Sequence, residues 1–322
     1  MAIVTNTFTT YDAIGIREEL SDVIYSVTPE KVPLLSMIGK SGAENTLFEW
    51  QTDSLAATDA TNAHLEADDI ASFTAVSPTV RVGNRQQISR KTMVIGGTEE
   101  KVNKAGRKSE INYQTIKRGK ELKRDIESIV FAAQGAVAGN ATTARKTAAL
   151  SAWLKTNTDF GATGADPVYT SGVPAAARTD GTLRAFTETI LKSVIQDMWT
   201  NGAEMHFMFV GPVNKQRASG FAGIATRNYD LSGTPRSTAI IASADVYVSD
   251  FGTLQIMPSR WQRERDAFLV DPGFLSIRHL RPFKREELAK TGDAKKFLLL
   301  TEWGLRVDNE EALGAAYDLT TT

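Results

Sequence analysis

The stretch RKSEINYQTIKRGKELKRDIESIVFAAQGAV, residues Arg107–Val137, decides the fold because it predicts one unusually long amphipathic helix. Apolar or small residues recur at helical spacing along it: Ile111, Thr115, Gly119, Leu122, Ile126, Ile129, Ala133 and Val137. At about 100° per residue these positions form a narrow stripe, with Lys117, Lys120, Glu121 and Arg124 on the opposite side. Such a helix spans on the order of 45 Å. It suits a rod onto which other elements dock, although an amphipathic helix lying on a sheet is the simpler interpretation.

Residues 1–45, before this helix, predict an arm. Gly15–Tyr25 carries a short helical pattern, and the apolar segment Val32–Lys40 follows Pro29 and contains Pro33. Two prolines this close together disfavour regular structure. Because the segment has few local partners, we expect it to dock elsewhere, on this subunit or on a neighbour.

Residues 46–97 predict an extended β-hairpin. Its outgoing strand, 46–52, places Phe48 and Trp50 on one face, and its return runs over 79–95 before two glycines. The polar stretch between the strands has little capacity to build a core. Long polar loops of this kind are usually functional or interacting.

Charged residues on the hairpin and in the C-terminal half are candidate contacts. They are Glu66, Asp68 and Asp69 at the hairpin tip, Arg81, Arg85, Arg90 and Lys91 on its return, and the mixed cluster Arg260, Arg263, Glu264, Arg265 and Asp266. The acidic tip lacks the spacing of a calcium loop, which favours a solvated tip. The basic residues either protect an exposed strand edge or pair with acidic residues of another subunit.

The rest of the chain predicts an Ala/Thr/Gly-rich insertion followed by a mixed α+β region. We expect residues 135–182, with little core-forming capacity, to be held in place by neighbouring subunits. Residues 183–322 predict helices at Phe186–Trp199 and 212–221. Strands are predicted at 205–210, 239–249, 252–257, 267–270, 274–279, 297–307 and 313–319. Their irregular alternation favours a mixed sheet.

The composition excludes several classes of protein. The net charge of −1 argues against a protein whose main function is to bind nucleic acid. The absence of cysteine excludes disulfides, thiolate metal sites and a cysteine nucleophile. Neither a signal peptide nor a membrane span is predicted, so we expect a soluble protein made in the cytoplasm.

No sequence motif indicates catalysis or a cofactor. Gly39-Lys40-Ser41 resembles the end of a phosphate-binding loop, but the glycine required five residues earlier is Leu34. The three histidines, His64, His206 and His279, lack the spacing of metal ligands. We therefore predict no catalytic, cofactor-binding or metal site.

The order of the predicted elements, together with several local motifs, resembles the major capsid proteins of tailed bacteriophages. These proteins share the Hong Kong 97-like fold. The motifs are VPLLSMIG (32–39), EWQTDSL (49–55), ELKRDIE (121–127), VDP (270–272), LRPF (280–283), LAKTGD (288–293) and EWGLRVDN (302–309). The resemblance covers most of the chain and departs from the family in the Ala/Thr/Gly-rich zone.

The resemblance implies an α+β capsid fold and divides the chain into six parts. They are an N-terminal arm (1–45), an extended loop (46–97), a peripheral domain with the spine helix (98–140), an insertion (141–182), an axial domain (183–270) and returning C-terminal strands (271–322). It implies self-assembly into pentamers and hexamers of an icosahedral virion shell around double-stranded DNA. Expected partners are a separate scaffold protein, a portal and a decoration protein, with only non-specific proximity to DNA and no membrane.

We expect inter-subunit contacts at Phe48, Trp50, Glu66, Asp68, Asp69, Arg81, Arg85, Arg90, Arg260 and Arg263. Two alternatives stay open: an encapsulin-like nanocompartment shell, which has the same fold, and a soluble α+β enzyme with an unrecognised site.

Overall fold

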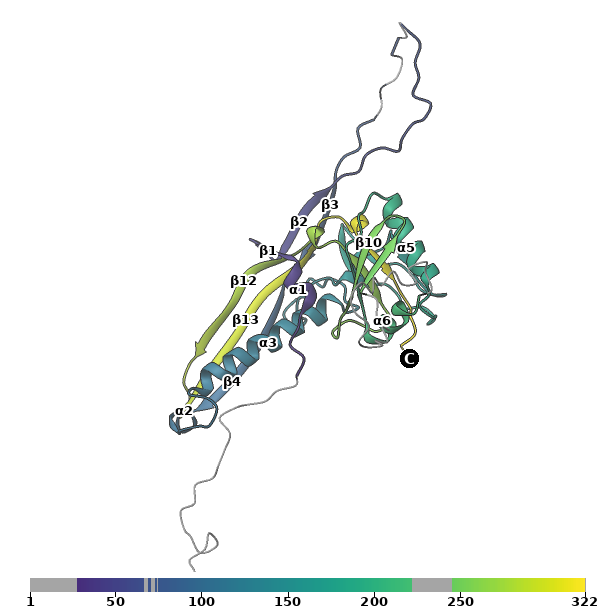
Figure 1. The fold of residues 1–322 in the computed structure, drawn as a ribbon. Helices are drawn as coiled ribbons and strands as arrows, with labels where there is room; N and C mark the ends of the chain where they lie inside the picture. The colour runs from purple at the N-terminus through teal and green to yellow at the C-terminus, as the bar shows by residue number, and fades with distance from the viewer. Residues whose placement is uncertain (1–27, 67–68, 71–72, 74, 222–244, 322) are drawn as a thin grey trace, which may run out of the picture.

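The computed structural model describes residues 28–66, 69–70, 73, 75–221 and 245–321. An elongated unit, with the long helix and a four-stranded sheet, lies beside a rounder unit with a six-stranded sheet (Figure 1). A hairpin extends from the elongated unit past the rest of the molecule. The predicted α+β class is confirmed. The helix predicted at Gly15–Tyr25 and most of the strand predicted at 239–249 lie outside the described residues.

The long helix, α3, runs over Glu110–Val130 and is shorter than the predicted Arg107–Val137. It begins where the Ser109 hydroxyl accepts a hydrogen bond from the backbone N–H of Asn112 at 3.3 Å. Such a cap satisfies one of the backbone donors that the first turn leaves without a helical partner.

The helix ends early because the chain after it joins another segment. The backbone N–H of Ala136 donates to the carbonyl of Pro174 at 2.7 Å. A Cβ on Gly135 would lie 2.4 Å from a carbonyl oxygen of that same segment. This close approach of two backbones excludes a continuing helix, so Ala133 and Val137 do not lie on the apolar stripe of α3.

The stripe of α3 packs on the four-stranded sheet, whose order is β1-β12-β13-β4. Its strands are β1 (Gly39–Gly42), β12 (Leu275–Leu288), β13 (Ala294–Val307) and β4 (Gln87–Gly96). Ile111 of α3 is buried with Phe297 and Leu299 of β13 and with Met93 and Ile95 of β4. The prediction that the tail strand returns to the long helix is therefore confirmed.

Strand β12 is longer than the predicted strand, which ended at His279. Residues Arg281–Leu288 are exposed and mostly charged, so they lack the alternation that marks a half-buried strand. They are held extended by pairing with β13, with shifts of register on either side of Arg281.

The rounder unit is built on a six-stranded mixed sheet of order β5-β14-β11-β8-β10-β9. Its strands are β5 (Thr158–Asp159), β14 (Gly314–Ala316), β11 (Ala267–Val270), β8 (Phe207–Val210), β10 (Gly252–Pro258) and β9 (Val246–Ser249). The β8–β10 and β5–β14 pairs are parallel and the others antiparallel, as the prediction of a mixed sheet requires. The helices are α5 (Glu188–Thr200) and α6 (Pro212–Ser219), and short 3₁₀ turns lie at Pro272–Phe274 and Glu310–Ala312.

The arm contains a short helix, α1 (Pro33–Met37), where the prolines had predicted irregular structure. Pro33 occupies the first turn, the one place where its missing N–H costs no helical hydrogen bond. Leu34 and Leu35 are buried against the rest of the chain. The arm was expected to dock either on its own subunit or on a neighbour. The segment Pro33–Met37 docks on its own subunit.

The expectation that residues 135–182 are held by neighbours is wrong for the core of this segment. It forms α4 (Leu150–Trp153), β5, β6 (Val168–Thr170) and β7 (Val173–Ala176). Ala148, Leu150 and Trp153 are buried in the main hydrophobic core. A few apolar residues in a polar, low-complexity segment were enough to anchor it within one chain.

Candidate assembly surfaces

The base of the hairpin is anchored within its own chain by Trp50. Strands β2 (Leu47–Thr52) and β3 (Val80–Arg85) pair antiparallel, and the short helix α2 (Gly97–Lys101) follows β4. The Trp50 ring stacks on Phe48 at 5.8 Å and lies 5.4 Å from Trp153. Its Nε1–H donates to the carbonyl of Asp308 at 3.1 Å. The prediction that Phe48 and Trp50 lie on one face is confirmed. On this face Trp50 contacts residues of its own chain.

Beyond this base, the described residues between 53 and 79 are all exposed. They include large apolar side chains: Leu55 is 98% exposed, Phe73 is 88% exposed and Val76 is 93% exposed. Glu66 and Asp69 are exposed as well, and Asp68 lies outside the described residues. An exposed apolar surface of this kind marks an interaction site.

The predicted basic contacts fall into different environments. Arg81 is 70% exposed and its Nε lies 3.4 Å from the Glu49 carboxylate on the paired strand. Arg90 and Arg260 are exposed and Arg85 is half-buried, and no ion pair joins any of the three to another described residue.

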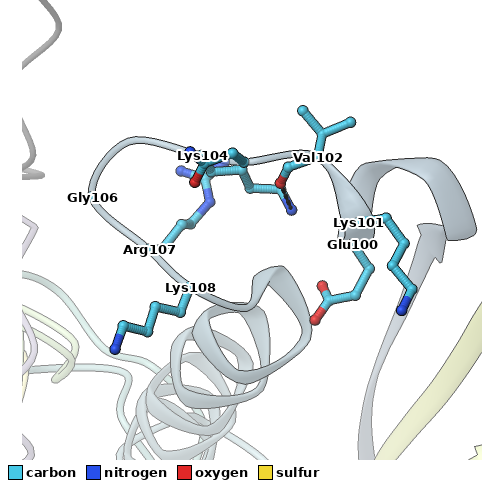
Figure 2. A pocket seen from close by; sticks show the side chains of 8 residues that line it. Glu100, Lys101, Val102, Lys104, Gly106, Arg107 and Lys108 are labelled. Carbon is cyan, nitrogen blue, oxygen red and sulfur yellow. Dashed lines mark hydrogen bonds between the residues drawn. The ribbon is translucent and has the colours of Figure 1, made fainter.

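A basic loop lies at the opposite end of the elongated unit from the hairpin. It joins α2 to α3 over residues 101–109 and encloses an open cavity of about 570 Å³, lined by Glu100, Lys101, Val102, Asn103, Lys104, Gly106, Arg107 and Lys108 (Figure 2). The Glu100 side chain points toward the start of α3, while Lys101 and Lys108 point away from the loop. The sequence prediction did not include this loop among the contacts.

The arm docks on α3 through a buried carboxylate that the sequence prediction also missed. Glu127 of α3 is fully buried and accepts the backbone N–H groups of Leu34 at 3.0 Å and Leu35 at 2.9 Å. These donors belong to the first turn of α1, so Glu127 caps a helix from outside its own segment. Burial raises the pKa of Glu127 to about 7, against the two N–H groups, which lower it.

The described residues contain no group of three or more His, Asp or Glu side chains that could hold a metal ion. None of the described helices is both long and apolar enough to cross a membrane.

Comparison with protein families identifies the family of this chain. A model of the SU10 major capsid protein matches residues 3–320. The chain belongs to the SU10 major capsid protein family. A curated relative, the major capsid protein of Escherichia phage Phieco32, is 29% identical over 344 residues, covering 96% of this chain and 96% of that protein.

The solved structures that resemble this SU10-family chain share its fold at low sequence identity. The capsid protein of cyanophage A-1(L) has a TM-score of 0.67 at 13% identity and covers 98% of this chain and 99% of its own. The encapsulin of Synechococcus elongatus PCC 7942 has a TM-score of 0.55 at 11% identity, covering 95% of this chain and 93% of that one. Because phage and encapsulin shells share the fold, the family match is what separates the two.

The SU10-family chain is therefore a capsid protein of Hong Kong 97-like fold that forms the phage head shell. Its role is structural rather than enzymatic, and its place is the virion capsid. This excludes both the nanocompartment and the enzyme that the sequence left open.

The buried charges of this capsid protein join distant segments. Arg178, from the Ala/Thr/Gly-rich segment, pairs with Asp318 near the C-terminus and lies 3.9 Å from Asp266, next to β11. Burial raises the pKa of Asp266 to about 7, against Arg263 and Arg178, which lower it. Asp318 is also buried, but hydrogen bonds from Arg178, the backbone N–H of Gly181 and Arg265 hold its pKa below the usual range.

Arg263, predicted as an inter-subunit contact, belongs to this internal cluster. It pairs with Asp180 and lies 3.5 Å from Asp266. Sequence spacing could not reveal the cluster, because its members come from three stretches of chain.

Proposed function

We propose that this capsid protein builds an icosahedral shell of pentamers and hexamers around double-stranded DNA, with residues 46–97 of each subunit lying over an adjacent subunit. The observation that carries this proposal is the hairpin tip. It exposes Leu55, Phe73 and Val76 almost completely, although burying such side chains is worth roughly 1.5–3 kcal/mol each. A neighbouring subunit that covers the tip supplies that burial.

The proposal assigns roles to the other parts of the chain as well. The sheet and α3 form the wall of the shell, as the peripheral domain, with the charged side of α3 facing solvent or a neighbour. The six-stranded sheet and its helices form the axial domain at the centre of each pentamer and hexamer. Phe48, Arg85, Arg90 and Arg260 remain proposed contacts between subunits, together with the acidic residues of the tip.

The proposed partners follow from the same role. A separate scaffold protein directs assembly, a portal joins the shell, and the outside of the shell is open to a decoration protein. The net charge of −1 supports only non-specific proximity to packaged DNA, since strong binding needs many cationic contacts.

Deleting residues 55–77 tests the role of the hairpin. We expect the shortened protein to keep the thermal unfolding temperature of the parent monomer, because the described residues of the tip are exposed and contribute no core. It should fail to form shells when imaged by negative-stain electron microscopy with the scaffold protein present.

A full-length control separates lost contacts from lost length. In Leu55→Ser/Phe73→Ser the loop keeps its length and loses two apolar side chains, so we expect markedly fewer shells at unchanged monomer stability. Unfolding of the deletion variant would show that the loop belongs to the core. A parent protein that stays monomeric with scaffold would refute the shell itself.

A further inference from the structure

The described hairpin tip is acidic and lacks compensating cations. From Asp53 to Val80, both included, the sequence has five carboxylates and neither Lys nor Arg. Of the described ones, Glu66 and Asp69 are exposed, and Asp59 accepts hydrogen bonds from the hydroxyl and backbone N–H of Thr61 at 2.7 and 2.8 Å. These hydrogen bonds hold the pKa of Asp59 below its usual range. The tip therefore presents a net negative charge at neutral pH.

The basic loop, residues 101–109, has the opposite composition: Lys101, Lys104, Arg107 and Lys108 with no carboxylate among them. Two of these cations pair with acids of the helices on either side of the loop. Lys104 lies 3.9 Å from Glu99 of α2, and Arg107 pairs with Glu110 of α3. Lys101 and Lys108 are exposed, and within the described part of the chain neither has a carboxylate partner. The loop therefore exposes the positive charges of Lys101 and Lys108 to solvent or to another molecule.

Glu100, the carboxylate that precedes Lys101 in the sequence, is engaged in hydrogen bonds at the start of α3. Glu100 accepts hydrogen bonds from the Ser109 hydroxyl at 2.7 Å and from the backbone N–H of Glu110 at 3.0 Å. It caps α3 and points toward the start of that helix (Figure 2). Lys295 of β13 lines an adjoining cavity with Lys101 and with Asp293, whose carboxylate lies 3.8 Å from the ammonium group of Lys290.

We propose that the acidic tip of one copy docks on the basic loop of a second copy, so that subunits associate head to tail. This inference rests on the proposed shell and identifies which surface of the neighbour receives the tip. Within one chain the two surfaces lie at opposite ends of the molecule (Figure 1), so they cannot satisfy each other. A head-to-tail contact repeats from copy to copy and closes when the rotation between copies allows it.

The free energy expected from the ion pairs between tip and loop is small. These pairs would fix the relative position of two subunits rather than supply most of the affinity. Exposed ion pairs contribute roughly 0–1 kcal/mol each, while the apolar side chains of the tip supply most of the burial. Complementary charge selects the correct neighbour and penalises wrong ones. Packaged DNA is the other anion that could occupy the loop, but it would leave the carboxylates of the tip without a cationic partner.

Charge reversal in the full-length protein tests the pairing. We expect Lys101→Glu/Lys108→Glu and Glu66→Lys/Asp69→Lys each to reduce the yield of shells in sedimentation velocity about tenfold, equivalent to about 1.4 kcal/mol. The variant with all four changes should recover most of the yield, because the pairs are restored with exchanged sign. As a control of equal charge, Lys117→Glu/Lys123→Glu on the exposed side of α3 should not be rescued by the reversed tip.

Each outcome decides between the alternatives. If the parent forms shells but the fourfold variant assembles no better than the separate reversals, the charge pairing is wrong and the proposed shell stands. If the reversed loop assembles normally but the particles lose packaged DNA, the loop faces DNA instead. A parent protein that never assembles overturns the shell and the pairing together.

Discussion

At the scale of single residues, Glu127 couples the docking of the arm to pH. Its carboxylate is buried under α1 and its pKa is raised to about 7 from a usual 4.5. The folded protein therefore holds this proton more tightly than the unfolded chain does. The resulting stabilisation is complete below about pH 4.5 and is lost as the pH rises through 7.

Replacing Glu127 with Gln tests this coupling. At about 1.4 kcal/mol per pH unit, the advantage of the parent over Glu127→Gln in urea unfolding should fall by up to about 3 kcal/mol between pH 4.5 and 8. Amide exchange at Leu34 and Leu35, corrected for its intrinsic pH dependence, gives a second measurement at the contact itself. Parallel stability curves for the two proteins would contradict the prediction.

At the scale of secondary-structure elements, the hairpin base should contribute to stability while its tip does not. Trp50 is half-buried between Phe48 and Trp153, so Trp50→Ala should lower the free energy of unfolding by roughly 2–3 kcal/mol. Trp50→Phe keeps a ring but loses the hydrogen bond to Asp308 and should cost only about 1 kcal/mol. Urea unfolding of the monomers measures both; losses confined to shell yield would place Trp50 in an interface between subunits.

Elements with a clear periodicity were predictable from sequence, and elements held by distant partners were not. Strand β11 has its predicted bounds, and α3 forms where the apolar stripe predicts a helix, although it ends at Val130 rather than Val137. The far half of β12 is polar and exposed, so only its pairing with β13 makes it a strand. Helix α1 was missed because Pro33 was interpreted as a breaker, whereas at the first turn it is tolerated.

At the scale of the whole molecule, the order of arm, hairpin, long helix and α+β region, together with motifs such as EWGLRVDN (302–309), predicted the fold and the structural role. The packing of residues 141–182 was not predictable, because its anchors are a few buried side chains such as Trp153. The contacts proposed at Phe48 and Arg90 stay predictions, since one chain cannot show them. Arg263 illustrates the opposite case: its charge pattern suggested a surface contact, and its partners lie within the chain.

The cluster around Arg178 joins three distant stretches into one rounder unit, and its removal should therefore affect the molecule as a whole. Arg178 is buried and pairs with the buried Asp318, which also accepts N–H groups of Gly161 at 3.1 Å and Gly181 at 2.9 Å. Breaking one partner of a buried ion pair typically costs about 3–5 kcal/mol, because the other charge stays buried. Because Asp318 keeps its ion pair with Arg265, we expect Arg178→Met to lose about 3 kcal/mol in urea unfolding, the lower end of this range.

The double variant Arg178→Met/Asp318→Asn distinguishes charge from packing. Asparagine keeps the left-handed backbone at position 318, where φ is +60°, and retains an acceptor for the glycine N–H groups. If the loss arises because Asp318 keeps only Arg265 as a cationic partner, at 2.7 Å, the double variant should be more stable than Arg178→Met alone by 1 kcal/mol or more, about the size of a coupled pair. If the packing of the guanidinium on Tyr317, 4.1 Å from the ring centre, is what matters, the two substitutions should add and the double variant should be the least stable.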